Sequence, residues 1–537
     1  MTDTSSELDR EARPAEGLSL AHLLREIPGD VCLEGDAGVM LWGVHHDSRR
    51  VGAGDLFVVR RGEKYDGRAF VPQALQRGAV ALLAEPDVEL PDAVKAGVPI
   101  VRTPDVMTAL AYSAAAVYGQ PGFSLDVIGL TGTNGKTTTT HLVRAAIDGS
   151  FGTPYCGVVG TVGHTFAGKT IPAAHTTPEA DELARVLAVM RKRGATHVAM
   201  EVSSIAIVQK RVAAVRYRVA AFTNLTQDHL DFHGSTEAYA AAKMELFTTM
   251  APGLAVVNVD DAFGETIARA VRCKVVRVRT TPGATDGDLV PERVEASVSG
   301  MKMRVRVLGR VLDMETRLVG WHNVENLLVA LGTVAALELD VDRAVDALAT
   351  ELGAPGRLDR CDGSDDDIVV LVDYAHTPDA LARVLDAIVA VTASGRLWCV
   401  FGCGGDRDPT KRAPMGEAVG KRADAAIVTS DNPRTEDPAA IAMPVEEGLR
   451  SGGLAREAIA ALSRGARGYL VELDRRNAID LAIASARPGD VVLVAGKGHE
   501  DYQVIGTTKR SFDDRLEARA ALKRRRNAVR TSRGQAG

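Results

Sequence analysis

The amino-acid sequence predicts an α/β protein of about three domains, built mainly from parallel sheets covered by helices. With 537 residues, the chain is too long for a single hydrophobic core. Residues 123–357 and 368–520 both repeat a short apolar strand followed by a helical segment, a rhythm typical of parallel sheets. Residues 18–122 hold further short strands separated by polar turns, and we expect them to form a mixed α/β domain.

Composition shifts mark the ends of the chain and the domain boundaries. The first residues are polar and include Pro14, and the last ones form a run rich in lysine and arginine. Both features favour segments without a packed core. Residues 275–318 contain paired strands, which predicts a small antiparallel addition. The predicted segments are a disordered lead-in (1–17), an N-terminal domain (18–122), a central domain (123–357), a C-terminal domain (358–522) and a basic disordered tail (523–537).

Net charge and cysteine usage limit the classes of function. The net charge of −6 argues against a nucleic-acid-binding protein, whose contact surface needs a broad positive excess. The six cysteines lack the paired spacing of a metal site and the density of a secreted scaffold, which fits a reducing compartment. The polar start does not resemble a signal peptide, and no apolar run reaches the ~20 residues that span a bilayer. We expect a cytoplasmic protein with small-molecule partners, no nucleic-acid partner and no membrane span, and we expect a monomer.

The clearest motif runs from Asp126 to His141 and combines an apolar strand, a glycine-rich turn and a helix. In that order, backbone N–H groups of the turn and the positive end of the helix dipole point at one spot, which suits a polyphosphate. Lys136 would add a positive charge at the outer phosphates, and Thr137 a hydroxyl for Mg²⁺. Leu130 stands where the usual spacing has a glycine. Strand, turn and helix together still predict a nucleotide-binding site.

Two further stretches of the central domain carry polar residues suited to the same site. The apolar strand 197–201 ends in Glu201, which is either a Mg²⁺ ligand at the ligand-binding edge of the sheet or a surface charge. Residues 224–234 contain two histidines and two aspartates within six residues, which could ligate a transition metal or act as acid and base. Because no cysteine accompanies them, we favour polar residues lining the nucleotide site. Lys243 lies in an amphipathic helix (239–247), where periodicity alone predicts a solvated lysine.

Three polar loops follow strands of the C-terminal series. They cover residues 402–408, 430–434 and 496–500. Loops at the carboxyl ends of neighbouring strands converge in an α/β fold, so their charged residues predict a pocket for a zwitterionic or multiply charged small molecule. An arginine fork matches a carboxylate, and carboxylates bind an ammonium group. The alternative is that these charges pair with each other on the surface.

In this order, the motifs resemble those of the Mur ligases, ATP-dependent enzymes that form amide bonds in peptidoglycan precursor synthesis. The resemblance covers nearly the whole chain and is greatest to the UDP-N-acetylmuramoyl-tripeptide synthetases that add diaminopimelate. The family's phosphate loop has the Thr-Gly-Thr-Asn-Gly-Lys-Thr form, which explains the displaced glycine. The resemblance implies an N-terminal UDP-sugar domain, a central P-loop ATPase with a parallel sheet, and a Rossmann-like C-terminal domain for the amino acid. The matching stretches are 131–139, 201–204, 224–229, 373–378, 404–408 and 431–434.

The resemblance implies roles for individual residues at the ATP site. The candidate catalytic residues are Lys136, Lys243 and His229, the last as a residue near the Mg²⁺ site, and Lys243 stands where the family carries a carbamylated lysine. A carbamate turns a cation into an anion, so Lys243 would hold Mg²⁺ together with Thr137 and Glu201. The implied ATP contacts are Gly132, Thr133, Asn134, Gly135, Lys136, Thr137, Thr138, Asn323, Arg357 and Asp373.

The same resemblance implies contacts for the other two substrates. Arg434 matches the family version that selects diaminopimelate rather than lysine. Diaminopimelate has a second carboxylate that can pair with the guanidinium, whereas lysine would leave a buried guanidinium unpaired, costing about 1–3 kcal/mol. The implied contacts of the UDP-muramoyl substrate are Ser48, His175, Thr176, Thr177, Ser203, Gln209 and Arg211. Those of diaminopimelate are Arg407, Asp431, Asn432, Pro433, Arg434, Gly496 and Glu500.

The implied reaction joins diaminopimelate to UDP-N-acetylmuramoyl-L-alanyl-D-glutamate through an acyl phosphate, with ATP and Mg²⁺, for cell-wall synthesis and hence cell shape and division. One departure from the family is Ile205, where a histidine is usual. It leaves open a Mur-like or folylpolyglutamate-type amide ligase with different substrates. A non-catalytic ATP-binding homologue is the third alternative, and the presence of Lys136, Thr137 and Glu201 argues against it.

Overall fold

The computed structural model describes residues 4–62, 66–226, 228–392 and 394–535. The chain divides into two compact units, and each is described by itself. Among the described helices, none is long and apolar enough to cross a membrane. The first unit comprises Met1–Glu292, Val305–Leu312 and Glu325–Leu348, and the second Arg293–Arg304, Asp313–Val324 and Ala349–Gly537.

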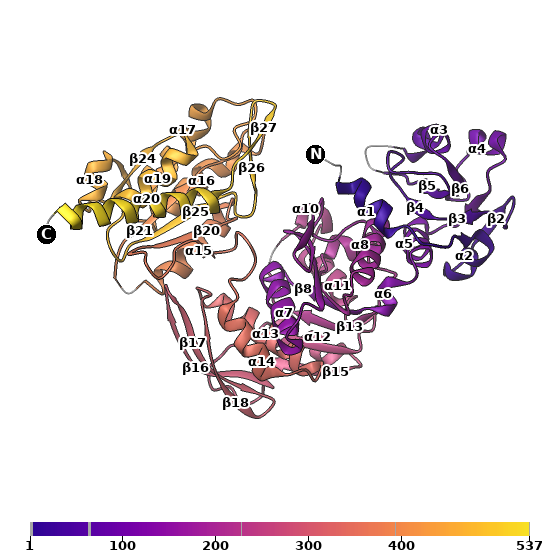
Figure 1. The fold of residues 1–537 in the computed structure, drawn as a ribbon, viewed down its shortest axis with the longest axis horizontal. Helices are drawn as coiled ribbons and strands as arrows, with labels where there is room; N and C mark the ends of the chain where they lie inside the picture. Colours follow the sequence, from indigo (N-terminus) through magenta and orange to yellow (C-terminus); the bar gives the residue numbers. More distant parts are fainter. Residues whose placement is uncertain (1–3, 63–65, 227, 393, 536–537) are drawn as a thin grey trace. The chain divides into compact units, whose positions relative to one another are not determined.

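A mixed α/β layer follows the first helix of the chain, as predicted for the N-terminal domain. Its main sheet has the order β2-β7-β6-β5-β4, with β2 antiparallel to β7 and the other neighbours parallel. Leu56 and Leu82 of its middle strands are fully buried, because helices cover the sheet (Figure 1). The strands are β2 (Cys32–Glu34), β4 (Gly43–His45), β5 (Asp55–Val58), β6 (Ala79–Ala84) and β7 (Ile100–Arg102), and β1 (Leu18–Ser19) pairs with β3 (Met40–Leu41). The helices are α2 (Leu20–Glu26), α3 (Val71–Gln76), α4 (Pro91–Ala96), α5 (Val106–Val117) and α6 (Pro121–Ser124).

Residues near the N-terminus form helix α1 (Thr4–Ala12), so the prediction of a disordered lead-in over residues 1–17 is wrong there. Leu8 and Ala12, four residues apart and therefore on one face, are 3% and 1% exposed. Helix α1 contacts α8 (Ala180–Lys192) of the central domain. The polar composition concealed this helix because two apolar contacts and several ion pairs, rather than a long apolar stripe, hold it.

The central sheet has eleven strands in the order β11-β10-β9-β12-β8-β13-β14-β15-β16-β17-β18. Strands β9, β12, β8, β13, β14 and β15 are parallel neighbours, which confirms the predicted strand–helix rhythm. In the pairing of β12 with β8, Glu201 lies opposite Leu130, so Glu201 and the phosphate loop leave the sheet at one edge. The strands are β8 (Asp126–Thr131), β9 (Cys156–Gly160), β12 (His197–Glu201), β13 (Tyr217–Phe222), β14 (Leu254–Asn258) and β15 (Lys274–Val278), and the helices are α7 (Lys136–Phe151), α8, α9 (Ser204–Val208), α10 (Leu230–His233), α11 (Thr236–Met244), α12 (Ala262–Ala270), α13 (His322–Ala336) and α14 (Val341–Thr350).

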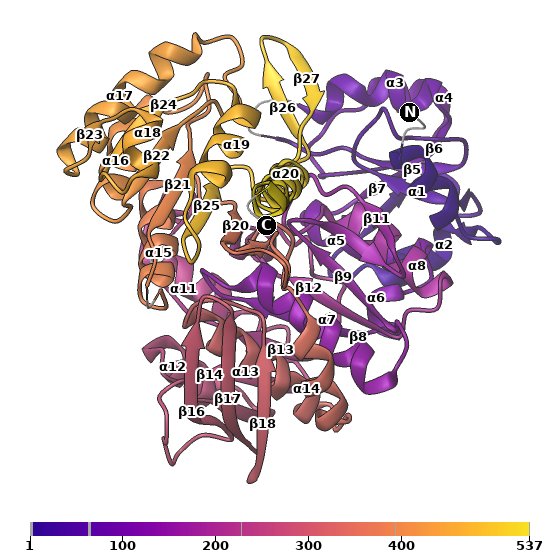
Figure 2. The same cartoon turned by 60° about the vertical axis from the view of Figure 1, so that its left-hand side comes forward.

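Hairpins extend this sheet at both edges. Strands β10 (Gly163–Phe166) and β11 (Lys169–Ile171) continue antiparallel from β9. At the other edge, β16, β17 and β18 run side by side, joined by two-residue turns (Figure 2). The predicted antiparallel addition over 275–318 therefore begins later, because β15 belongs to the parallel part. The strands are β16 (Leu289–Ser297), β17 (Gly300–Val307) and β18 (Arg310–Thr316).

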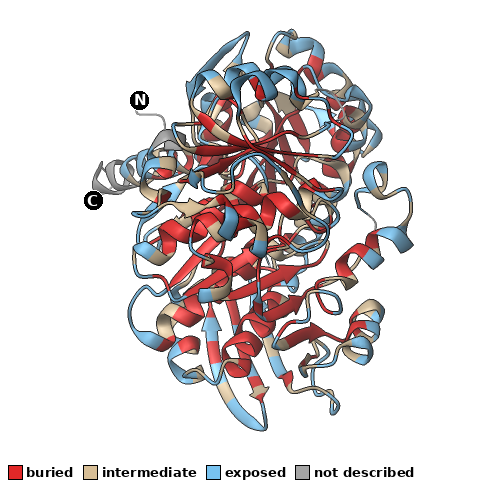
Figure 3. Ribbon diagram, turned by 90° about the vertical axis from the view of Figure 1, so that its right-hand side faces the viewer, coloured by how far each residue is buried: buried red, intermediate tan, exposed pale blue. Residues whose placement is uncertain are grey.

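The second strand–helix series forms a seven-stranded sheet in the order β19-β20-β25-β21-β22-β24-β23. All neighbours are parallel except β19 and β20, as a Rossmann-like domain requires. Buried residues follow the strands and the inner faces of the helices, with exposed residues outside (Figure 3). The strands are β19 (Asp359–Arg360), β20 (Val369–Asp373), β21 (Leu397–Phe401), β22 (Ala425–Val428), β23 (Ala455–Arg456), β24 (Gly468–Val471) and β25 (Val491–Ala495), with a hairpin of β26 (Tyr502–Ile505) and β27 (Thr508–Ser511). The helices are α15 (Pro378–Val389), α16 (Arg412–Gly420), α17 (Pro438–Ser451), α18 (Ile459–Ser463), α19 (Arg475–Ser485) and α20 (Asp514–Gln535).

Helix α20 corrects the prediction of a basic disordered tail over residues 523–537, because it continues to Gln535. Several arginines in its described part have partners on the domain surface. Arg524 pairs with Asp480 at 2.8 Å and Arg525 with Asp367 at 2.7 Å. The basic run is therefore part of a docked helix. The boundaries predicted for the three domains stay predictions.

Helices α16 and α17 approach each other through glycines. A Cβ on Gly448 would lie 1.9 Å from the carbonyl oxygen of Ala413, and one on Gly416 would lie 2.1 Å from that of Val445. Gly448→Ala should therefore destabilise the protein by about 1–3 kcal/mol through overpacking, and lower its thermal unfolding midpoint. Met443→Ala on the same helix is the control, since that side chain is 62% exposed and its loss should leave the midpoint unchanged. Equal midpoints for both variants would contradict this packing.

Candidate active site

The phosphate loop joins β8 to α7 and is built on two glycines with positive φ. Gly132 has φ +151° and Gly135 φ +84°, and a Cβ on Gly132 would lie 2.0 Å from Thr223 Oγ1. Lys136 folds back over the loop and donates to the carbonyl oxygens of Gly132 and Thr133, both at 2.9 Å. The predicted strand, turn and helix are all present, with Thr138 in the first turn of α7.

Asn224, which follows the neighbouring strand β13, holds the phosphate loop through hydrogen bonds. Its carbonyl oxygen accepts from the Thr133 N–H at 2.7 Å, and its Oδ1 accepts from the Asn134 N–H at 3.0 Å. Thr223 Oγ1 donates to the Asn134 carbonyl at 2.7 Å. These bonds fix the loop backbone, a role that the sequence motif around Asn224 did not specify.

Glu325 in turn orients Asn224, and sequence reasoning missed it. Asn224 Nδ2 donates to Glu325 Oε1 at 3.0 Å, which leaves Oδ1 to face the loop. Burial raises the pKa of Glu325 to about 7, and the negative charges of Asp261 and Asp260 add to that rise. Hydrogen bonds from Asn224 and Asn258 oppose it. No local pattern marks Glu325, because its partners lie far away in the sequence.

Glu201 and Thr137 meet at the carboxyl edge of the sheet. Glu201 is 1% exposed, and its Oε2 accepts from Thr137 Oγ1 at 2.9 Å. Its Oε1 accepts from the Thr161 N–H at 2.7 Å, and a Cβ on Gly160 would lie 2.3 Å from that oxygen. The surface-charge interpretation of Glu201 is therefore wrong.

This donor set fits Mg²⁺. A hydroxyl and a carboxylate are the hard oxygen ligands that Mg²⁺ takes, and Mg²⁺ completes its shell with water and substrate phosphates. Among the described residues, no three His, Cys, Asp or Glu side chains cluster as a metal cage. The transition-metal alternative for residues 224–234 therefore fails within the described part of the chain.

Lys243 is buried, contrary to the surface position that periodicity predicts. It is 1% exposed, its Nζ donates to the Gly132 carbonyl at 2.8 Å, and Nζ lies 4.4 Å from the centre of the Tyr239 ring. Tyr239 OH is 3.2 Å from Thr133 Oγ1, so α11 packs on the loop. Burial and the nearby charge of Lys136 hold the pKa of Lys243 well below its usual range.

His229 lies at the margin of this group. It has φ +50°, its Nε2 is 3.6 Å from Asp228 Oδ2, and its ring centre is 6.2 Å from that of Tyr239. His233 instead contacts Ser204 Oγ at 2.9 Å. The contacts of Lys136 at 2.9 Å are with the Gly132 and Thr133 carbonyls, and the catalytic role of His229 stays a prediction.

Five residues predicted for the UDP-muramoyl substrate form one cluster. Thr177 Oγ1 donates to the Glu201 carbonyl at 2.8 Å and accepts from the Ser203 N–H at 3.1 Å. Arg211 donates to the Thr177 carbonyl at 3.0 Å and to Gln209 Oε1 at 2.6 Å. Thr176 accepts from Thr161, which itself contacts Glu201. The cluster thus adjoins the Glu201 edge.

Two other residues predicted for that substrate lie apart from this cluster. His175 is exposed, and Ser48 donates to Gln73 Oε1 at 2.6 Å in the N-terminal layer. Glu179 links the two regions, because Arg60 of the N-terminal layer and Arg211 each pair with it at 2.8 Å. Ile205 lies half-buried in α9, next to Ser204.

In the second unit, the charges predicted to bind an amino acid converge on Lys497, which sequence reasoning missed. Lys497 is fully buried, and its Nζ lies 3.2 Å from Asp431 Oδ1 and 3.5 Å from Glu500 Oε2. Asn432 accepts from Lys497 at 3.1 Å and donates to Glu500 at 3.1 Å. We name Asp431, Asn432, Arg434, Lys497 and Glu500 the amino-acid cluster.

The backbone of Arg434 is strained, and this conformation fixes the direction of its side chain. Its φ is +51°, and its N–H and C=O bond to Val504 and Gly506 at 3.1 and 2.7 Å. The guanidinium donates to the Gly405 carbonyl at 2.7 Å. A Cβ on Gly405 would lie 1.9 Å from the Pro433 carbonyl, and Gly496, with φ +120°, borders Asp431. Arg407 is exposed on the adjoining loop.

Three predicted ATP contacts also lie in the second unit. Asp373 accepts from the Leu358 and Ala375 N–H groups at 2.7 and 2.8 Å, and burial raises its pKa. Arg357 lies 5.1 Å from the centre of the Tyr374 ring. Its Nε is buried and has no hydrogen-bond partner among the described residues, so the side chain suits an added acceptor. Asn323 Nδ2 donates to the Val319 carbonyl at 2.8 Å.

Comparisons with known families match three segments of the chain. The Mur ligase family catalytic domain matches residues 41–118, the Mur ligase middle domain 130–334, and the Mur ligase glutamate ligase domain 356–498. Together these segments include the phosphate loop and every residue of the amino-acid cluster except Glu500, which lies just beyond the third segment.

Relatives are similar over most of their length. UDP-N-acetylmuramoyl-L-alanyl-D-glutamate--2,6-diaminopimelate ligases from Gloeobacter violaceus and Streptomyces coelicolor are 45% and 43% identical, covering 90% and 91% of this chain and 94% of each relative. A solved structure of a ligase with the same name is 33% identical, with a TM-score of 0.68, covering 95% of this chain and 99% of its own. Mycobacterium tuberculosis folylpolyglutamate synthase, 21% identical over 72% of this chain and 91% of its own with a TM-score of 0.54, shares the fold alone.

Glu325 should make stability depend on pH. Its pKa is about 7 in the folded protein against an ordinary 4.5, so the folded state retains a proton that the unfolded chain loses between those values. Stability should fall as pH rises from 4.5 to 7, by about 3 kcal/mol at most. Glu325→Gln should flatten this part of the profile, measured as thermal unfolding midpoints at about pH 5 and about pH 8, near the two ends of the range over which the proton is lost. Exposed Glu237→Gln is the control, and an unchanged slope in Glu325→Gln would contradict the assignment.

Proposed function

The chain belongs to the Mur ligase family, and on this premise we propose that it joins 2,6-diaminopimelate to UDP-N-acetylmuramoyl-L-alanyl-D-glutamate, using ATP. The observation that carries the substrate choice is the amino-acid cluster in the second unit. Diaminopimelate has two ammonium groups and two carboxylates. The cluster supplies Asp431 and Glu500 for ammonium groups and Arg434 for a carboxylate, with Lys497 already paired inside.

The reaction proceeds in two balanced steps. The terminal carboxylate of the dipeptide attacks the γ-phosphorus of ATP, so that ADP leaves and an acyl phosphate forms. The amino group of diaminopimelate then attacks the acyl carbon, and the tetrahedral intermediate expels phosphate and loses a proton to give the amide. The protein's part is positioning and charge balance, because phosphoryl transfer needs little covalent help.

The loop residues provide that balance at the phosphates. Lys136 exchanges its contacts with the Gly132 and Thr133 carbonyls for phosphoryl oxygens, and the loop N–H groups bind the remaining oxygens. Thr137 and Glu201 would hold Mg²⁺, which supplies charge neutralisation when bound. The Thr176–Arg211 cluster holds the muramoyl dipeptide beside this edge.

Lys243 acts as a carbamate. A buried amine with a lowered pKa is neutral and therefore nucleophilic, and its nitrogen adds to the carbon of CO₂ with release of one proton. The resulting anion relieves the repulsion between Lys243 and Lys136, which share the Gly132 carbonyl. We further propose that the protein works in the cytoplasm as a monomer with Mg²⁺.

One assay tests the function as a whole. Phosphate release from ATP is followed with UDP-muramoyl dipeptide and either diaminopimelate, lysine or glutamate. Release with diaminopimelate at least tenfold above the other two is expected, since one charge-assisted hydrogen bond contributes about 1.5–3 kcal/mol. Phosphate release with glutamate but not with diaminopimelate, or no release with any of the three amino acids, would overturn the proposal.

Arg434→Ala should lower kcat/KM for diaminopimelate by about 10- to 100-fold, the equivalent of one charge-assisted hydrogen bond. Arg434→Lys should recover only part of the loss, because an ammonium lacks the planar fork. The KM for ATP serves as the internal control and should not change. A loss shared equally by both substrates would show that Arg434 supports the fold instead.

Lys243→Ala should reduce turnover by about 100-fold or more, because it removes a charge that stabilises the phosphoryl-transfer site. Added acetate, a small carboxylate that can enter the vacated space, should restore part of the rate. Lys210→Ala is the matched control, since Lys210 is 41% exposed and pairs with Glu245 on the surface. Full activity of Lys243→Ala without acetate would exclude the carbamate.

A further inference from the structure

Helix α1 connects the two parts of the first unit that flank the proposed UDP-muramoyl site. Leu8 and Ala12 are buried, and α1 lies against α8 (Figure 1). On the other side, Arg13, the residue after α1, pairs at 3.4 Å with Asp55, which is the first residue of β5. A short amphipathic helix therefore touches both the N-terminal layer and the central domain.

Asp9 is the charged centre of this connection. Its carboxylate accepts from Arg50 through Nε at 3.1 Å and through a terminal nitrogen at 2.6 Å. Its Oδ1 also lies 3.0 Å from Nε of Arg185, a side chain on α8 that is only 1% exposed. Asp9 thus brings together two guanidinium groups from different domains.

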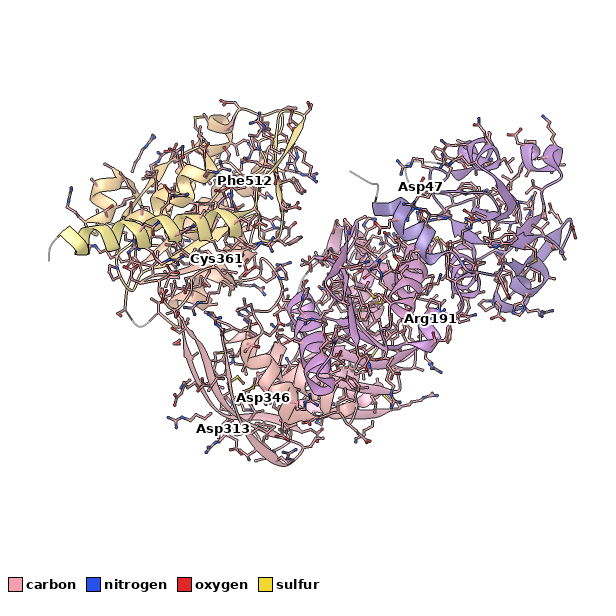
Figure 4. The ribbon with its side chains drawn as sticks, in the orientation of Figure 1. Asp47, Arg191, Asp313, Asp346, Cys361 and Phe512 are labelled. Atoms are coloured by element: carbon pink, nitrogen blue, oxygen red, sulfur yellow. The ribbon has the colours of Figure 1, made fainter. Side chains whose placement is uncertain are left out.

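Arg50 and Arg185 hold the turn that presents Ser48. Arg50 closes this turn, and its N–H donates to the Asp47 carbonyl at 3.0 Å (Asp47 is labelled in Figure 4). At the start of the turn, His46 pairs with Asp181 at 2.8 Å. Asp181 also pairs with Arg185 at 3.2 Å. The turn is therefore held at its start by Asp181, through His46, and at its end by Asp9, through Arg50.

A second set of contacts secures α1 on α8 independently of Asp9. Glu11 accepts from Arg193 through Nε at 2.7 Å and through a terminal nitrogen at 2.5 Å. Lys192 Nζ donates to the carbonyls of Glu11 and Arg13, both at 2.9 Å, and so caps the carboxyl end of the helix. Loss of the Asp9 charge alone should therefore leave α1 in place.

We propose that Asp9 is a positioning residue for the UDP-muramoyl substrate. It neutralises Arg50 and Arg185 and so fixes the turn that carries Ser48. Without it, two guanidinium groups face each other, one of them fully buried, and the turn loses its anchor at Arg50. Binding then has to order the turn, which weakens affinity for this substrate and not for the nucleotide. The inference rests on the proposed function, since it assigns Ser48 to this substrate.

The test uses the full chain and two ligands. Titration calorimetry measures the Kd of UDP-N-acetylmuramoyl-L-alanyl-D-glutamate and, separately, of ADP. Asp9→Asn should raise the first Kd by about tenfold, as expected for one charged contact, and leave the second within about twofold. Asp9→Glu, which keeps the carboxylate, should recover part of the affinity. Glu7→Gln, an exposed neutralisation on the same helix, should change neither Kd.

The outcomes separate the two proposals. Failure of the unaltered protein to bind the UDP-muramoyl dipeptide would overturn the proposed function, and this inference with it. Normal binding by the unaltered protein and an equal Kd for Asp9→Asn would overturn only the inference. An equal weakening of both ligands, with a lower thermal midpoint, would also overturn it, because Asp9 would then serve the fold alone.

Discussion

The side-chain nitrogens of two lysines donate to one oxygen atom, the carbonyl of Gly132, and the central site depends on that shared contact. Lys136 lies 2.9 Å and Lys243 2.8 Å from it. If both nitrogens were protonated at this separation, they would repel by several kcal/mol at the effective dielectric of a protein, on the order of 332/(20·r) with r in Å. The repulsion and burial explain why the pKa of Lys243 is depressed. The loop is therefore arranged to receive negative charge, which a polyphosphate brings.

Glycines at the strand ends make this arrangement sterically possible. A Cβ on Gly132 would collide with Thr223, and one on Gly160 would collide with the Glu201 carboxylate. Both collisions involve side chains from neighbouring strands of the sheet. The parallel order of β9, β12, β8 and β13 therefore determines where glycine is required.

Local sequence patterns predicted the structural elements that are determined by neighbouring residues in the sequence. The phosphate loop, the strand ending in Glu201 and the two strand–helix series follow from apolar runs and glycine spacing, and the structure confirms them. Helical periodicity failed for Lys243, because the phosphate loop covers a face of α11 that would otherwise be solvated. Glu325 had no local signal, since tertiary contacts alone give it partners. Lys497 lay in a predicted polar loop, but nothing local showed that it is buried and pairs with Asp431. Helix α1 was missed because ion pairs compensate for its small apolar face.

The charges of the second unit show how a specific site can exist before its ligand arrives. Lys497 pairs with Asp431 and Glu500, so these three side chains together keep one net negative charge that can attract an ammonium group. Arg434 instead donates to a neutral carbonyl, that of Gly405, and its positive φ is held by bonds to the strand β26 and the turn after it. Strain of this kind costs about 1–3 kcal/mol and persists only where the surroundings impose it. The surroundings therefore fix in one direction a guanidinium that has no ion-pair partner among the described residues. A ligand with a distal carboxylate gains an ion pair there that a ligand ending in an ammonium cannot form.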